Sequence, residues 1–469
     1  MEYLENRTFD EIQIGDSATL TRTLTEQDIM LFAVMSGDIN PAHVDPDYAK
    51  NSQFREVIGH GMWSGALIST VLGTQFPGPG TIYLGQDLRF RHPVGVGDTV
   101  TVKVTATERN AEKGRLTLET ECVNQDGKVV VSGTAHVIAP REKVRRPRID
   151  LPDVRIDDRE TRFRQIAARV KGRKLDPVCT AVAHPCDIES LAGALEAGRE
   201  GVIIPVLVGP EDRLRETARL AELDLAGVTI VPVAHSHEAA AVAVQLAREG
   251  KVEAIMKGSL RTAELIEAVI ARDSGLRTER RLSHLFAMDV PTYPKALFIT
   301  DGVINIEPTL EEKRDIVQNA IDLVHSLGIT MPRVAILAAM ETVNPRMRAT
   351  IEAAVLCKMA DRGQITGAVL EGPLGFDNAI SLDAARAGHI LSPVAGQADI
   401  LVVPDIESGN MLVKQLTYLA DALAAGIVLG ARVPIVVPNR ADDRLSRMAS
   451  AMLMQIAARG GASSHERPA

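Results

Sequence analysis

Residues 36–45 read Ser-Gly-Asp-Ile-Asn-Pro-Ala-His-Val-Asp, and this stretch decides how the amino-terminal part of the chain is interpreted. Gly37 is a typical helix stop, and Asp45 followed by proline is a typical helix start. Asp38 and His43 are therefore expected on a loop between two helices, which the proline within the stretch tightens. The pattern predicts that both side chains point toward one spot.

A carboxylate and a neutral imidazole that face one water molecule form a base and acid pair, because histidine changes protonation near neutral pH. Two other interpretations apply to the same residues. A calcium loop is excluded, because Ala42 and His43 occupy the positions where it needs an oxygen ligand and a glycine. Turn formation explains the aspartate, asparagine and proline but not His43. This stretch alone leaves catalysis and turn formation equally open.

A second signal begins at residues 54–62, FREVIGHGM, which precede the apolar run WSGALISTVLG. The run predicts a buried helix. From residue 99 to residue 137 apolar side chains recur at every second position, and Asp126-Gly127 is a type I′ hairpin signal, so an antiparallel sheet is expected around the helix. Gly61 would begin the helix, where free backbone amides can stabilise an oxyanion. His60 is expected to be a structural residue of the turn.

The motifs SGDINPAHVD and VIGHGM, in this order, resemble the MaoC-type (R)-specific enoyl-CoA hydratases. The resemblance implies a hot dog fold for residues 1–139, in which an antiparallel sheet wraps a long helix. It also implies that Asp38 and His43 activate water for addition to a trans-2-enoyl-CoA. The Gly61 amide would polarise the thioester, and Asn40 would contact the substrate. Because subunits of this fold pair, the resemblance implies a homo-oligomer.

The sequence pattern changes after residue 139. Residues 140–162 include the charged, proline-bearing stretch PREKVRRPRIDLP and are expected to form a linker. Residues 163–469 alternate short apolar runs with amphipathic segments, which predicts two α/β lobes with parallel sheets. Ligands of such sheets bind beyond the carboxyl ends of the strands. No GxGxxG motif follows a strand and no GxxxxGK[ST] motif occurs, so nicotinamide and nucleoside triphosphate functions lose their usual support.

Five stretches follow or cross the expected strands of this second part. They are MKGSLRTAEL (256–265), RLSHLFAMDVP (281–291), ITDGVINIEPTLEEK (299–313), LEGPLGFDNAIS (370–381) and PDIESGNMLVKQL (404–416). Taken singly, each is explained by loop chemistry, with Gly409 or Asn410 starting a helix and Asp377 capping one. Together they resemble the phosphate acetyltransferase and phosphate butyryltransferase family, with details that lean toward the butyryl branch.

This second resemblance implies acyl transfer between coenzyme A and inorganic phosphate by direct attack. It makes Asp377 the residue that exchanges a proton with the CoA thiol, whose ordinary pKa is about 8.5. Phosphate needs cations and helix N-termini, and the candidates by position are Lys257, Arg281, Arg346 and Lys414, with Asn410 as a further substrate-binding residue. Residues 337–347, LAAMETVNPRM, depart from the serine-rich strand end of the acetyltransferases, which admits a butyryl, longer or 3-hydroxylated acyl group.

Composition narrows the class of protein. The formal net charge of −9 at pH 7 gives no general attraction to nucleic acid or to an anionic membrane. The four cysteines are scattered, which predicts a reduced cytoplasmic protein, and no metal-ligand spacing occurs. The most apolar stretch, 419–431, is too short to span a bilayer.

The sequence therefore predicts a cytoplasmic, bifunctional enzyme with no metal and no tightly bound cofactor. Its substrates would be acyl-CoA, CoA, and phosphate or acyl phosphate. A regulatory protein that binds acyl-CoA, with one or both domains catalytically silent, is the alternative.

Overall fold

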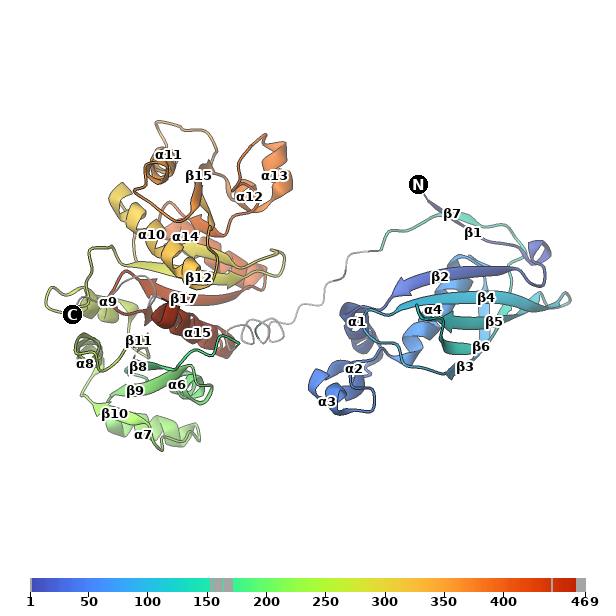
Figure 1. Cartoon of the computed structure of the whole chain (residues 1–469), viewed down its shortest axis with the longest axis horizontal. Coiled ribbons are helices and arrows are strands. Elements are labelled where there is room, and N and C mark those ends of the chain that lie inside the picture. The colour runs from blue at the N-terminus through green and yellow to red at the C-terminus, as the bar shows by residue number, and fades with distance from the viewer. Residues whose placement is uncertain (1, 152–153, 155–162, 164–171, 440–441, 461–469) are drawn as a thin grey trace. The chain divides into compact units, whose positions relative to one another are not determined.

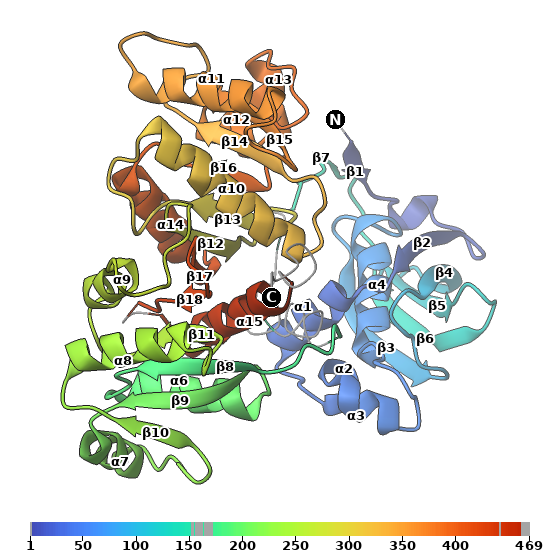
Figure 2. The ribbon, with the colours of Figure 1, turned by 60° about the vertical axis from the view of Figure 1, so that its left-hand side comes forward.

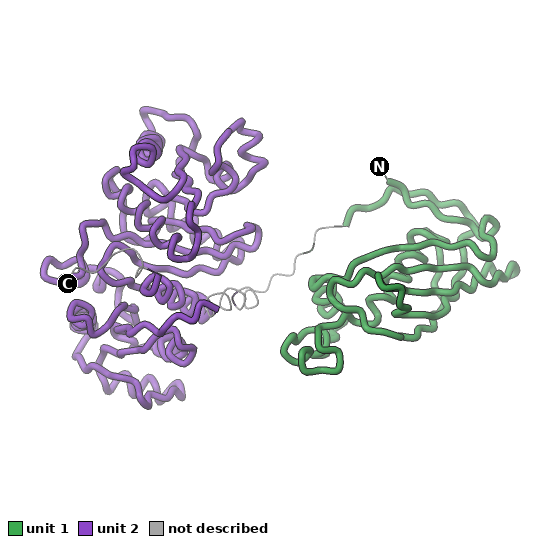
Figure 3. The backbone as a smooth tube through the Cα atoms, in the orientation of Figure 1, with its two compact units in different colours: residues 1–156 green, residues 157–469 purple. Residues whose placement is uncertain are grey.

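The chain divides into two compact units, Met1–Ile156 and Asp157–Ala469 (Figure 3). The structure is a computed structural model, and it describes residues 2–151, 154, 163, 172–439 and 442–460. No helix in these ranges is both long enough and apolar enough to cross a membrane.

The segment expected to be a linker, 140–162, is described only in part, because residues 152–153 and 155–162 lie outside the described residues. Within it, strand β7 (Arg145–Pro147) pairs antiparallel with β1 (Tyr3–Glu5). This portion of the segment therefore packs within the first unit. The domain limits 1–139, 140–162 and 163–469 stay a prediction.

The first unit is built on a five-stranded antiparallel sheet in the order β2-β4-β5-β6-β3 (Figure 1). In that order its strands are Ser17–Thr23, Thr99–Asn110, Arg115–Val123, Val129–Ile138 and Ile82–Phe90. Val100, Val102 and Val104 alternate along β4 and have no exposed area, as a period of two requires. Burying each such side chain contributes about 1.5–3 kcal/mol.

A central helix, α4 (Gly61–Thr74), packs against β4, β2 and β3 (Figure 2). Its Trp63 and Ile68 belong to one apolar cluster with the valines of β4. A sheet around a long apolar helix is the hot dog fold, so the expected fold of this part is confirmed. Shorter helices complete the unit: η1 (Phe9–Glu11), α1 (Glu26–Ser36), α2 (Pro41–Val44) and α3 (Pro46–Asn51).

The hairpin between β5 and β6 is confirmed, but its turn is not type I′. Only Gly127 has a left-handed backbone, with φ of 75°. The side chain of Asn124 accepts hydrogen bonds from the amides of Asp126 and Lys128, at 3.1 and 2.9 Å. These hydrogen bonds stabilise a loop that is longer than a two-residue type I′ turn, and Asp126 therefore does not need a positive φ.

The second unit contains, among its described residues, an eleven-stranded sheet in the order β10-β9-β8-β11-β18-β17-β12-β13-β16-β14-β15. The strands in that order are Thr229–Pro232, Ile203–Gly209, Val178–Ala183, Ala254–Lys257, Ile435–Val436, Leu423–Leu429, Ser283–Asp289, Leu297–Thr300, Ile400–Val402, Arg333–Leu337 and Val369–Leu374. The first five are parallel to one another, and so are the last four. Each lobe thus has the parallel strands that the sequence predicts.

The middle of this sheet differs from a simple parallel sheet. Strand β12 is antiparallel to both β13 and β17, and β17 is antiparallel to β18. The two parallel groups therefore run in opposite directions, because three antiparallel pairings separate them. Strand β17 lies in the apolar stretch 419–431, for which the sequence indicated no strand.

Helices cover both faces of the sheet (Figure 1). One face packs against α6, α7, α10, α11 and α15, which span Ile188–Arg199, Glu211–Leu220, Leu310–Ser326, Arg348–Asp361 and Arg444–Gly460. The other packs against α8, α9, α12, α13 and α14, which span Ser236–Arg248, Thr262–Ile270, Phe376–Ile380, Leu382–Ala387 and Ile406–Leu419.

Candidate active sites

The segment that carries Asp38 begins where α1 ends, at Gly37, whose φ is 75°. Asn40 then caps α2, its side chain accepting a backbone hydrogen bond at 3.1 Å. Asp45 caps α3 as expected. His43 therefore lies on a short helix and not on an open loop, because an asparagine followed by proline starts a helical turn between the two expected helices.

A backbone carbonyl fixes the orientation of the His43 ring. Its Nδ1 lies 2.8 Å from the carbonyl oxygen of Ile58. Because a carbonyl only accepts hydrogen bonds, neutral His43 carries its proton on Nδ1 and has a lone pair on Nε2. The ring thus offers a basic nitrogen.

His60 joins Asp38 and His43. It is only 4% exposed. Its Nε2 donates to the backbone carbonyl of Asp38 at 3.0 Å, and its ring centroid lies 4.1 Å from that of His43. Its Nδ1 is buried without a hydrogen-bond partner in the described part of the chain. The structure is consistent with the expected structural role and adds a direct contact with both candidate catalytic residues.

Polar side-chain atoms of Asp38, His43 and His60 all lie within 4.8 Å of one another. The acid and the imidazole therefore face the same spot, as the sequence pattern predicts. A nitrogen or oxygen from each is also a donor type that binds metal ions, whereas the sequence led us to expect no metal-binding group. The catalytic roles of Asp38 and His43 stay a prediction.

Gly61 is the first residue of α4, and no side chain caps this end of the helix. The first amides of the helix have no intrahelical acceptor and can stabilise a negative charge. A Cβ atom at Gly61 would lie 2.9 Å from the Phe90 ring, so only glycine fits without a shift. Residues 36–60 thus bring a carboxylate and an imidazole to the amide end of a buried helix.

The second unit holds a cavity of about 740 Å³. Strands β12 and β17 line it, together with α14, α15 and residues 437–439, 442 and 443. Two of the expected substrate-binding residues, Asn410 and Lys414, line this cavity. They lie one turn apart in α14, which begins at Ile406 with Asp405 as its cap. The interpretation of Gly409 or Asn410 as a helix start is therefore wrong, because Asp405 accepts the amide of Ser408 and starts the helix earlier.

The same cavity is lined by residues that the sequence analysis missed, His284 and Asp442 among them. Burial raises the pKa of Asp442, whose carboxylate accepts a hydrogen bond from the Asn439 amide at 2.8 Å. Burial lowers the pKa of His284 to about 3. His284 lies in the stretch 281–291, but its residue type alone did not single it out there, and Asp442 stands in none of the five stretches. Only the folding of distant strands and helices places both on one cavity.

Asp377 is exposed and does not belong to the lining of this cavity. It lies in the first turn of α12, whose cap is Gly375, so the interpretation of Asp377 as a helix cap is wrong. A Cβ at Gly375 would meet carboxylate oxygens of Glu341 and Asp377 at 2.7 and 2.9 Å, so glycine lets both approach the backbone. Glu341 also accepts a hydrogen bond from the side chain of Asn378 at 2.6 Å. The role of Asp377 stays a prediction.

Three other expected phosphate ligands do not line this cavity. Lys257 is 7% exposed and donates to the carbonyls of Gly258 and Leu260, at 3.2 and 3.3 Å. Arg281 is held by Asn305 and Glu312, at 2.8 and 3.1 Å. Arg346 is exposed, and its side chain makes no ion pair or hydrogen bond to the described residues. The structure thus brings together only Lys414 and Asn410 from the expected set.

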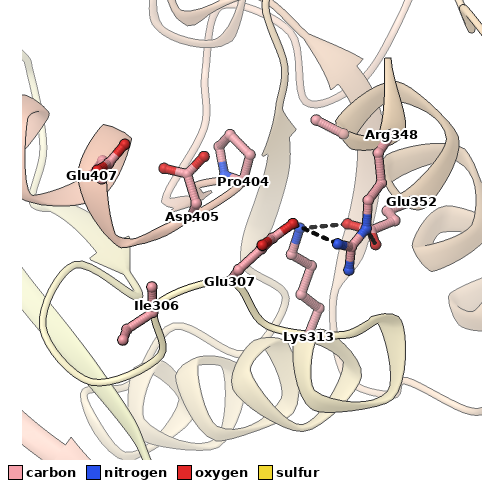
Figure 4. A pocket seen from close by; sticks show the side chains of 9 residues that line it. Ile306, Glu307, Lys313, Arg348, Glu352, Pro404, Asp405 and Glu407 are labelled. Atoms are coloured by element: carbon pink, nitrogen blue, oxygen red, sulfur yellow. Dashed lines mark hydrogen bonds and ion pairs between the residues drawn. The ribbon is translucent and has the colours of Figure 1, made fainter. Parts of the chain in front are cut away.

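A second cavity, of about 330 Å³, contains cations that the sequence did not single out as ligands (Figure 4). Lys313 is 5% exposed and its Nζ lies 2.5 Å from Glu352. Arg348 bridges Glu352 and Glu307, at 2.6 and 2.7 Å. The carboxylates neutralise both cations. The pair Lys313 and Glu352 is 39 positions apart in sequence, so no local pattern connects them.

A hot dog unit with an acid and imidazole site, followed by a two-lobed α/β unit with a cavity against its central strands, defines a two-part enzyme. Family comparison agrees with this class. A model described as phosphate acetyl/butaryl transferase matches residues 233–455, and one described as MaoC like domain matches residues 11–127.

The matches to individual relatives extend over most of each relative's length. A phosphate acetyltransferase of Rhizobium meliloti is 62% identical over 274 residues, which are 58% of this chain and 87% of the relative. A branched-chain phosphotransacylase from Enterococcus faecalis V583 is 28% identical with a TM-score of 0.53, covering 59% of this chain and 99% of that chain. An R-hydratase from Pseudomonas aeruginosa is 45% identical with a TM-score of 0.33, covering 33% of this chain and 100% of that chain.

The chain belongs to the phosphate acetyl/butyryltransferase family and carries a MaoC-like domain in front. Both resemblances drawn from the motifs are thereby confirmed.

Proposed function

We propose that the protein is a bifunctional enzyme of acyl-CoA thioesters. The first domain, residues 1–139, hydrates a trans-2-enoyl-CoA to an (R)-3-hydroxyacyl-CoA. The second, residues 163–469, transfers an acyl group between CoA and inorganic phosphate. The observation that carries the first activity is the meeting of Asp38, His43 and His60 within 4.8 Å beside the start of α4.

In the proposed hydration, Asp38 and the Nε2 lone pair of His43 hold one water molecule. One base removes a proton from the water, the oxygen bonds to C3, and a proton is delivered to C2. Charge develops on the thioester oxygen, and the Gly61 amide stabilises it. A fixed His43 tautomer supports this role, because the Ile58 carbonyl keeps the proton on Nδ1.

The test of hydration uses crotonyl-CoA and follows the loss of enoyl absorbance. Asp38→Asn should lower the rate by about 100-fold or more, since it removes a general base. Asp47→Asn is the matched control, because Asp47 is 95% exposed on the neighbouring helix α3. A rate for Asp38→Asn equal to that of the control would remove Asp38 from the mechanism.

In the proposed acyl transfer, an oxygen of phosphate attacks the thioester carbonyl, the carbon–sulfur bond breaks, and the CoA sulfur takes a proton. The cavity of about 740 Å³ supports this activity, since it is large enough for part of a CoA thioester. Lys414 and Asn410 offer a cation and an amide there. The reaction needs no covalent acyl-enzyme.

Two carboxyl groups compete for the proton exchange with the CoA thiol. Asp377 is the residue that the family resemblance favours. Asp442 lines the cavity, and burial raises the pKa of its carboxyl group above the usual value. Asp377→Asn and Asp442→Asn should be compared for CoA release from acyl-CoA plus phosphate, with Asp383→Asn as a matched control because Asp383 is 95% exposed on α13.

The variant that loses activity by about 100-fold identifies the proton carrier. If neither variant differs from the control, neither Asp377 nor Asp442 carries this proton. If neither activity is measurable while acyl-CoA still binds, a regulatory protein that senses acyl-CoA replaces this proposal.

We further propose that the protein acts as a homo-oligomer in the cytoplasm, with no tightly bound cofactor. Several large apolar side chains support oligomerisation, since Val34, Met35 and Ile39 are each more than 70% exposed near the first site. Light scattering of the purified full chain tests it. A mass equal to one chain at micromolar concentration would contradict the oligomer.

A further inference from the structure

One face of two paired strands lines the cavity of about 740 Å³. His284 and Phe286 lie two positions apart in β12. Ala424 and Gly426 lie two positions apart in β17, and β17 pairs antiparallel with β12. Residues two apart in a strand point to the same face, and directly paired residues share that face. An imidazole and a phenyl ring therefore stand beside two residues with a small side chain or none.

His284 is the polar group of this face. It is 2% exposed, and its ring centroid lies 4.3 Å from that of Phe286. Its Nδ1 is buried without a hydrogen-bond partner in the described part of the chain. Because burial lowers the pKa of His284 to about 3, the imidazole is neutral at physiological pH. A neutral imidazole has one N–H donor and one lone pair.

Gly426 makes space for this imidazole. A Cβ atom at Gly426 would lie 2.9 Å from both Cε1 and Nε2 of His284. The ring is therefore held closely between β17 and Phe286 in one orientation. Such a ring is a fixed hydrogen-bonding group, and its unmatched nitrogen needs a partner from a ligand.

The chemistry of the partner follows from the surroundings. A phosphate group needs cations, and Lys414 on α14 offers one in this cavity, whereas His284 is uncharged and contacts the apolar ring of Phe286. A carbonyl group only accepts hydrogen bonds. A hydroxyl group both donates and accepts, as the neutral imidazole does, and it can stand on an otherwise apolar chain.

We infer that His284 binds a hydroxyl group on the acyl chain, so that the second domain prefers short 3-hydroxyacyl groups to the corresponding unsubstituted acyl groups. This inference rests on the proposed acyl transfer. The position of the hydroxyl at C3 is the one that the proposed hydration creates. The 3-hydroxyacyl-CoA that the first domain produces would thus belong to the class of substrates that the second domain prefers.

The test measures CoA release by the full chain with phosphate and either (R)-3-hydroxybutyryl-CoA or butyryl-CoA. Dehydration by the first domain releases no CoA itself, and a parallel assay with crotonyl-CoA shows how much of the signal its product contributes. The wild-type protein should favour the hydroxylated substrate in kcat/KM by about tenfold or more, because a site that hydrogen-bonds a hydroxyl rejects the analogue without it. His284→Phe should remove this preference while butyryl-CoA is still used.

Met411→Leu is the matched control, because it changes an apolar side chain that lines the same cavity from α14, and it should alter both substrates equally. Activity with butyryl-CoA also reports that each variant is folded. His284→Asn is the second variant if His284→Phe does not fold, and it should retain part of the preference through its amide.

Equal use of both substrates by the wild-type protein would overturn the inference. So would an equal loss for both in the folded His284 variants, which would instead indicate contact with the thioester carbonyl. Absence of CoA release with either substrate and with acetyl-CoA would contradict the proposed acyl transfer itself, and is thus a separate outcome.

Discussion

The rings of His43 and His60 lie with their centroids 4.1 Å apart and their planes tilted by 36°. His60 also donates from Nε2 to the backbone carbonyl of Asp38, and it immediately precedes the first residue of α4. One buried side chain thus contacts the Asp38 backbone and the His43 ring, and it adjoins the amide end of α4 at the proposed hydratase site. The geometry makes His60 a positioning residue.

Replacing His60 should therefore lower hydration without changing acyl transfer. His60→Leu should reduce kcat by about 100-fold with little change in KM, because misplacing a catalytic group by about 1 Å has effects of this size. His60→Asn should recover part of the loss, since its amide can donate to the Asp38 carbonyl. Steady-state kinetics with crotonyl-CoA measure this split. Equal rates for the two variants would show that the hydrogen bond is unimportant.

Gly61→Ala should reduce hydration because its Cβ would lie 2.9 Å from the Phe90 ring and displace either α4 or the ring. Phe90→Leu combined with Gly61→Ala should restore part of the rate, since the smaller side chain relieves the contact. The double variant is compared with each single variant under the same conditions. Failure of the double variant to exceed Gly61→Ala would indicate that crowding is not the cause.

Metal removal should leave hydration unchanged, because the proposed mechanism uses proton transfer by Asp38 and His43 alone. The rate after dialysis against EDTA is the measurement. Added Zn²⁺ should inhibit, since Asp38, His43 and His60 offer ligand atoms within 4.8 Å of one another. Loss of activity on dialysis, with recovery on adding a metal, would contradict the metal-free mechanism.

The buried ion pair of Lys313 and Glu352 should stabilise the second unit. Their side chains are 6% and 10% exposed. Lys313→Met should lower the free energy of unfolding by about 1–3 kcal/mol, because the buried Glu352 carboxylate loses its lysine and is left with Arg348 as a cationic partner. The double variant Lys313→Met with Glu352→Leu should recover much of this loss. Urea unfolding followed by circular dichroism measures both, and an unchanged midpoint for the single variant would contradict the expectation.

His284 should make the second unit less stable as the pH falls. Its pKa is about 3 when folded and 6.5 when unfolded, so the unfolded chain binds the extra proton between these values. The stabilisation is fully present above pH 6.5 and is lost progressively as the pH falls toward 3. His284→Asn removes this titration. Between pH 7 and pH 5, the free energy of unfolding should fall for both proteins. The fall should be about 2 kcal/mol smaller for His284→Asn than for the wild-type protein.

Two optical signals separate the units in this experiment. Trp63 is the single tryptophan of the chain and lies in the first unit, so fluorescence reports that unit. Circular dichroism follows both. The fluorescence midpoint should be the same for the wild-type protein and His284→Asn at each pH. The unfolding of the second unit is the circular dichroism change that the fluorescence does not follow. If its free energy depended on pH in the same way in the wild-type protein and in His284→Asn, that result would contradict a neutral buried His284.

Secondary structure was predictable from the sequence where a single short stretch of chain contains all the residues that determine it. The alternation of Val100, Val102 and Val104 predicts a strand with one buried face, and the buried face is observed. Asp45 and its following proline predict the start of α3, which begins there. Asp38 and His43 were recognisable for the same reason, because they are five residues apart and a short turn brings them together.

The sequence by itself therefore determined the two families, the central helix of the first unit, the parallel strands of each lobe and the acid and imidazole pair. Only the tertiary structure decided the reversal of β12 and β17, the stacking of His60 on His43, the ion pair of Lys313 with Glu352 and the cavity that His284 and Asp442 line. The reason is physical: periodicity and capping act over a few residues, whereas side chains far apart in sequence meet through the packing of whole strands and helices.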